Sequence, residues 1–156
     1  MPVARAIEHL SAAESDLAAG FCLLADIGGA SKEMSESARQ LASQAEGRAA
    51  ALKSWAERFP PATRSQPMGL RQSLREEIPR NGAGADAGLA LLQELRRVFL
   101  MAQECALGWM MVESAALASK ERQLLDLVSA GRAAVGKAVK WLEAQIERTS
   151  PDVLVR

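Results

Sequence analysis

The chain has 156 residues, 49% of them hydrophobic and 24% charged, so it is long enough to bury a core and is predicted to form one domain over residues 1–156. Its 19 basic and 19 acidic side chains cancel, which leaves no basic footprint for nucleic acid or for an anionic membrane surface. The densest apolar stretch, residues 98–112, is too short and too interrupted by polar residues to cross a bilayer, and a cytoplasmic location is expected by default.

The residue types favour helices over strands. Alanine and leucine are abundant, tyrosine is absent, and aromatic residues make up only 4% of the chain. The prolines stand at positions 2, 60, 61, 67, 79 and 151, and they leave long stretches free of helix breakers. We therefore predict an all-α protein.

Two helices are predicted in the first part of the chain. The first covers residues 3–27 and ends at Gly28-Gly29, because glycine readily takes the left-handed conformation that closes a helix. Its inner face repeats at steps of three and four: Ile7, Leu10, Glu14, Leu17, Phe21 and Leu24. The second is capped by Ser31 and reaches about Phe59, before two prolines. Its inner stripe is rich in small residues: Ala38, Ala42, Ala45, Ala49, Leu52, Ala56 and Phe59.

A single long connection, residues 60–85, follows and is rich in proline, glycine and serine. Within residues 67–78, Leu70, Leu74 and Ile78 are spaced by four, which suggests a short amphipathic helix. Such a helix would either dock on the bundle as part of a crossover or bind a partner.

Two more helices are predicted after this connection. The third begins near Asp86, a plausible cap, and continues to about residue 118, where Ser119 marks a break. The fourth runs to about residue 148 and ends before Ser150-Pro151. Short first and third connections make two hairpins, and the long middle connection can carry the chain from one end of the bundle to the other.

Four segments, one from each predicted helix, are similar to the metal-binding helices of the ferritin-like family, in particular of bacterioferritin-like and rubrerythrin-like proteins. They are EHLSAAESDLAAGFCLLA (residues 8–25), EGRAAALKSWAERF (46–59), AQECALGWMM (102–111) and GKAVKWLEAQIE (136–147). The resemblance implies a four-helix bundle with a long crossover between helices two and three. It also implies a di-metal site with one glutamate from each of two helices and Glu-x-x-His from the other two.

The resemblance assigns Glu14, Glu46 and Glu104 to metal-binding positions, but it finds the other positions changed. Where the family has its histidines and its remaining glutamate, this chain has Ala49, Val135 and Ala138. The one histidine, His9, precedes Glu14 by more than a turn and is interpreted as a surface or helix-end residue. We therefore predict a vestigial site with no cofactor. Weak binding of iron or manganese to the remaining carboxylates is the alternative.

Without a metal, glutamates on an inner face need a proton or a cationic partner, and Arg48 and Arg132 are the nearest candidates by helical position. Arg132 is interpreted as surface-exposed, and an inward Arg132 is the alternative. Cys22 and Cys105 are interpreted as free, buried thiols, and the three tryptophans as core residues. No phosphate-binding loop and no catalytic triad is found, so no catalytic residue is predicted.

The leading hypothesis for function is a non-catalytic bundle that acts as a structural or protein-interaction module. The alternatives are a divergent metal-carboxylate protein, either iron-handling or an oxidoreductase, and a small-ligand carrier. The third helix is apolar on more than one face, through Val98, Leu100, Met101, Leu107, Trp109, Met110 and Met111. Either the crossover segment or another subunit would cover the second face, and we expect a homodimer that buries part of the third or the first helix.

Overall fold

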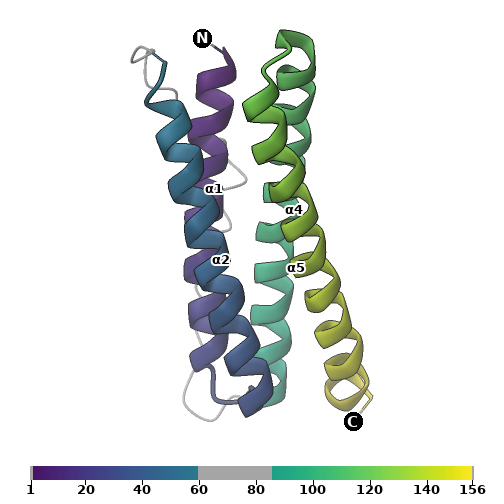
Figure 1. Cartoon of the computed structure of the whole chain (residues 1–156). Helices are drawn as coiled ribbons and strands as arrows, with labels where there is room; N and C mark the ends of the chain where they lie inside the picture. Colours follow the sequence, from purple (N-terminus) through teal and green to yellow (C-terminus); the bar gives the residue numbers. More distant parts are fainter. Residues whose placement is uncertain (1, 60–85, 156) are drawn as a thin grey trace.

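The computed structural model describes residues 2–59 and 86–155, and in these ranges the chain is helical with no strand. The helices are α1 (Pro2–Asp26), α2 (Lys32–Ala56), α4 (Ala87–Ser119) and α5 (Arg122–Leu154), as Figure 1 shows. They pack as an all-α four-helix bundle, which confirms the predicted fold class.

Helices α2 and α4 both run from the lower to the upper end of the bundle in Figure 1. At the lower end, the turn between α1 and α2 lies against the start of α4: a Cβ added to Gly29 would lie 2.7 Å from the carbonyl oxygen of Ala87. At the upper end, Arg58 after α2 donates a 3.5 Å hydrogen bond to Gln123 at the start of α5. The described residues on either side of the gap, Phe59 and Asp86, therefore lie at opposite ends of the bundle, and the predicted crossover of residues 60–85 itself lies outside the described residues. The short helix expected within 67–78 lies outside the described residues.

The left-handed conformation expected at Gly28-Gly29 is not found, because neither glycine has a φ in the left-handed region, although α1 does end just before them at Asp26. Two helix starts, by contrast, carry the cap residues expected for them. The Ser31 hydroxyl accepts a 3.1 Å hydrogen bond from the amide of Met34, and the Asp86 carboxylate accepts one of 2.9 Å from the amide of Gly88. The predicted break near residue 119 is made by Lys120, which takes the left-handed conformation with φ of 57°. These contacts satisfy amide groups that a helix end leaves without a partner.

The predicted end of the last helix near residue 148 is wrong, because α5 continues through Pro151 to Leu154. Proline has no N–H group, so the helix loses the hydrogen bond that this residue would donate to the carbonyl four residues earlier. The fixed φ of proline is itself close to the helical value. One further turn then forms, and the amide of Val155 bonds to the Pro151 carbonyl at 3.2 Å.

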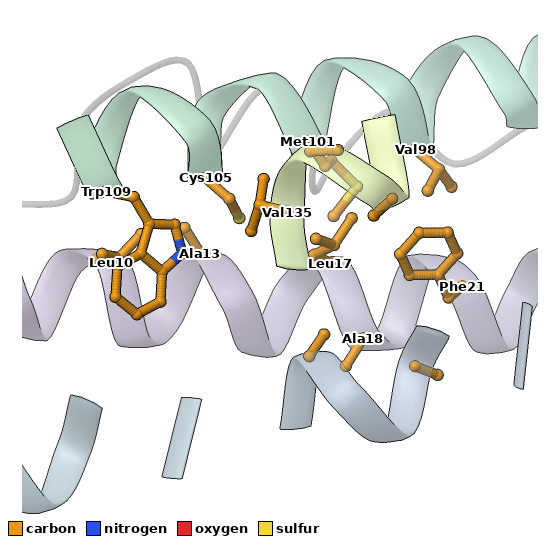
Figure 2. Close-up of a cluster of buried hydrophobic side chains, with 14 of the residues drawn as sticks. Leu10, Ala13, Leu17, Ala18, Phe21, Val98, Met101, Cys105, Trp109 and Val135 are labelled. Carbon is orange, nitrogen blue, oxygen red and sulfur yellow. The ribbon is translucent and has the colours of Figure 1, made fainter. Parts of the chain in front are cut away.

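The core lies between the inner faces of all four helices, and Figure 2 shows part of it, with side chains of α1 and α4 facing each other. Of the three tryptophans, Trp109 is fully buried while Trp55 and Trp141 are half-buried at the edge of the core. Both cysteines are free, as predicted, but only Cys105 is buried. The expectation of a buried Cys22 is wrong, because Cys22 lies one position beyond the inward-facing Phe21 and is turned about 100° away from the core.

Candidate functional site

Glu14 lies in the middle of the core with no exposed surface, and three nitrogen atoms surround its carboxylate. The Nε and Nη2 atoms of Arg48, on α2, are both 2.9 Å from Oε2. The indole Nε1 of Trp109, on α4, donates a 2.9 Å hydrogen bond to Oε1. Two other helices therefore supply donors to a carboxylate that the inward stripe of α1 carries into the core.

Helical spacing explains why these side chains meet. Glu14 stands on the inner stripe of α1, three residues before the buried Leu17. Arg48 follows the buried Ala45 by three residues, so it lies at the edge of the inner face of α2, with its side chain 11% exposed. Trp109 extends from α4 towards α1, beside Leu10, as Figure 2 shows.

The space for the indole of Trp109 comes from α5. A Cβ added to Gly131 would lie 2.5–2.6 Å from three atoms of the six-membered ring, so only glycine leaves room for the ring at this position. One and two turns further along, Val135 and Ala138 present apolar side chains to the core, each 1% exposed. Helix α5 therefore covers its side of the site with apolar side chains and contributes no polar group to it.

Burial raises the pKa of Glu14 above its ordinary value of 4.5, because the charged form loses the solvation of water. The positive charge of Arg48 and the hydrogen bonds from Trp109 and Arg48 oppose this rise without cancelling it. The neighbouring Cys105 has its pKa raised well above its usual range, first by burial and then by the negative charge of Glu14. A thiol so placed stays protonated and is a poor nucleophile.

A second pair of polar groups lies between α1 and α4. His9 Nε2 is 3.6 Å from Glu104 Oε1, and the two side chains are 20% and 9% exposed. The expectation that His9 is a surface or helix-end residue therefore needs a correction, since it faces a carboxylate across a helix interface. His9 lies four residues before the buried Ala13, so the two share one side of α1, and this spacing was the available signal.

The structure does not bring the three predicted carboxylates together. Glu14 is fully buried, Glu104 lies beside His9, and Glu46 is exposed. Residues two apart on a helix point in nearly opposite directions, so an Arg48 that faces inward turns Glu46 outward. Arg132, the other candidate partner, is exposed on α5 and pairs with Glu113 at 2.7 Å.

These residues do not fit a di-metal centre. Both carboxylate oxygens of Glu14 already accept hydrogen bonds, and the guanidinium of Arg48 places a positive charge where a metal ion would lie. Within residues 2–59 and 86–155, no group of three or more histidine, cysteine, aspartate or glutamate side chains is arranged to hold a metal ion. The positive charge beside the Glu14 carboxylate is that of Arg48.

One buried ion pair was missed from the sequence. Glu94 and Arg97 on α4 are 2% and 6% exposed, and Arg97 Nη2 lies 2.7 Å from Glu94 Oε1. Their spacing of three places them on one face of the helix, which was the available signal.

In the folded protein we expect a maleimide to label Cys22 and not Cys105. Cys22 is exposed, whereas Cys105 is fully buried and holds its proton. Mass spectrometry of protein labelled in native buffer should show one adduct per chain, and labelling in denaturant should show two. Cys22→Ser should abolish the native adduct. Equal labelling of both thiols in native buffer would contradict the buried position of Cys105.

Comparison with known proteins gives no match to a family model, to a curated protein or to a solved structure. Among the described helices, none is long and apolar enough to cross a membrane.

Proposed function

We propose that this protein is a non-catalytic four-helix bundle of the ferritin-like arrangement that serves as a structural or protein-interaction module. One observation supports the proposal: the carboxylate of Glu14, the residue that the resemblance assigns to a metal-binding position, is paired with Arg48 and Trp109. A cytoplasmic location is part of the proposal, and the two free thiols are compatible with a reducing compartment.

The ion pair supports a structural role more than a chemical one. The attraction within a buried arginine–carboxylate pair roughly offsets the cost of desolvating its two charges, so the pair neutralises the buried acid and adds little net stability. Catalysis by a carboxylate requires access to substrate, and Glu14 has no exposed surface. The side chains of Arg48 and Trp109 fill the position that a small-ligand carrier would need to leave open.

Protein purified without chelator should contain far less than one tightly bound iron or manganese ion per chain. The reason is that Arg48 already supplies the positive charge that Glu14 needs. Elemental analysis after incubation with each ion and desalting measures this. Two retained ions per chain, lost in Glu14→Ala, would contradict the proposal and favour the metal-carboxylate alternative. Glu46→Ala is the matched control, since Glu46 is exposed.

A further inference from the structure

The outward face of α4 carries several exposed apolar side chains between residues 107 and 117. Leu107, Met110 and Met111 are each about half exposed, at 50%, 49% and 49%, and Leu117 is 59% exposed. The expectation that this helix is apolar on more than one face is confirmed, because Trp109 on the opposite face is fully buried. A monomeric protein rarely leaves several large apolar side chains together in water, so this face is a candidate interaction surface.

The spacing of the outward residues is that of a helix-binding seam. Steps of three and four alternate along what we call the α4 seam, which consists of Leu100, Gln103, Leu107, Met110, Ser114 and Leu117. Leu100 is half-buried against the core, and the other five side chains are exposed. This is the 3.5-residue repeat with which one helix packs lengthwise along another. The hydroxyl of Ser114 donates a 3.1 Å hydrogen bond to the Met110 carbonyl, so it can enter such a seam without losing its partner.

We propose that the α4 seam binds the α4 seam of a second copy of this chain, antiparallel and about a twofold axis. Pairing about the midpoint between Leu107 and Met110 places each of these residues opposite the other in the second copy. The next layer outward pairs Gln103 with Ser114, and the layer beyond pairs the two leucines at the ends of the seam. Apolar residues therefore meet apolar ones and polar residues meet polar ones, which is the self-complementarity that a twofold interface requires.

The flanks of the seam are compatible with this pairing. On one flank Glu104 comes closest to Met111 of the second copy, and on the other Glu113 comes closest to Ala106. No like charges meet, and Glu113 is already paired with Arg132 in its own chain at 2.7 Å. A chain with zero net charge adds no long-range repulsion to self-association.

The length of the seam sets the expected strength of the dimer. The overlapping part of α4, about 22 residues, is about 33 Å long at ~1.5 Å per residue. One helix pair of this length is at the small end of specific interfaces, so we expect a concentration-dependent dimer with a dissociation constant of about micromolar order. This inference takes from the proposed function only the role of an interaction module, and it does not depend on whether the core binds metal.

The test measures the mass of the full chain by analytical ultracentrifugation from about 1 to 500 μM, a range chosen to bracket a micromolar dissociation constant. The wild type should shift with concentration from 16.7 kDa to about twice that mass. Leu107→Glu and Met110→Lys, each alone, should remain monomeric with unchanged helix content. An equimolar mixture of the two variants should dimerise again, because Leu107→Glu in one chain then faces Met110→Lys in the other. Leu23→Glu, at an exposed leucine on α1, should leave the dimer intact.

Three results would overturn the inference. A wild type that stays monomeric over the whole range excludes the dimer. A dimer that persists in both single variants places the interface elsewhere. Dimers that are lost in the single variants but not restored by mixing exclude the antiparallel pairing. Elemental analysis of the same samples tests the proposed function separately, so failure of one proposal is distinguishable from failure of the other.

Discussion

Replacing Arg48 with methionine is expected to lower the free energy of unfolding by about 3 kcal/mol at neutral pH. The substitution keeps much of the volume of the side chain but removes the charge that pairs with Glu14. The remaining carboxylate has no exposed surface, so water cannot solvate it. We expect the lower end of the usual range for a broken buried pair, because the Arg48 side chain keeps 11% of its surface exposed.

The stability lost in Arg48→Met should increase as pH rises. Burial raises the pKa of Glu14 in the folded state above its unfolded-state pKa of 4.5. The contribution of this group to stability is therefore fully present below pH 4.5 and is lost as pH rises through the folded-state pKa. Arg48 lowers that pKa, so its removal raises the pKa further. The difference between Arg48→Met and the wild type should therefore be small in acid, where Glu14 is protonated in both, and should grow towards neutral pH.

Urea denaturation at about pH 4 and pH 7 measures this difference. The double variant Glu14→Gln with Arg48→Met should recover most of the lost stability, since no buried charge remains. Arg132→Met is the matched control: this arginine is 43% exposed and pairs with a surface carboxylate, so its loss should be about 1 kcal/mol or less. Equal losses in the two arginine variants, or a loss in Arg48→Met that does not change with pH, would contradict the role assigned to Arg48.

The helices could be predicted from the sequence because their signals are local. Periodic apolar residues identify the inner faces, and Ser31 and Asp86 are cap residues that act within three positions of themselves. The end of α5 was less predictable, because a proline near a helix end removes a single backbone hydrogen bond. Whether one more turn forms beyond Pro151 depends on a small energy difference that the pattern does not show.

The candidate site was predictable in part. An inward Glu14 follows from the stripe of α1, and Arg48 was one of two arginines that its position allowed. Choosing between Arg48 and Arg132 requires the relative rotation of α2 and α5, which spacing within one helix does not determine. The resemblance to metal-binding helices placed Glu46 with Glu14, but an inward Arg48 excludes an inward Glu46 because the two are only two residues apart. The contact between Trp109 and Gly131 joins two helices, and no residue pattern within either helix predicts it.

That contact gives the second large effect: Gly131→Ala should destabilise the protein by about 1–3 kcal/mol. The added Cβ would lie 2.5–2.6 Å from three atoms of the Trp109 ring, closer than real carbon atoms approach. The indole is rigid and is held by its 2.9 Å hydrogen bond to Glu14, so it cannot move away without leaving the carboxylate short of a donor. Either α5 shifts outward or the hydrogen bond breaks, and both outcomes cost stability.

The matched control is Gly136→Ala, one and a half turns further along the same helix. A Cβ at Gly136 meets no atom within 4 Å, so alanine there should stabilise the protein by about 0.5–1 kcal/mol through helix propensity alone. The two substitutions are chemically identical and should have opposite signs in thermal or urea denaturation. Trp109→Phe, which shortens the ring system, should cost less stability in the Gly131→Ala background than in the wild type. Gly131→Ala that stabilises as much as Gly136→Ala would show that the indole does not hold α5 in place, and the closure of the site by α5 would then be wrong.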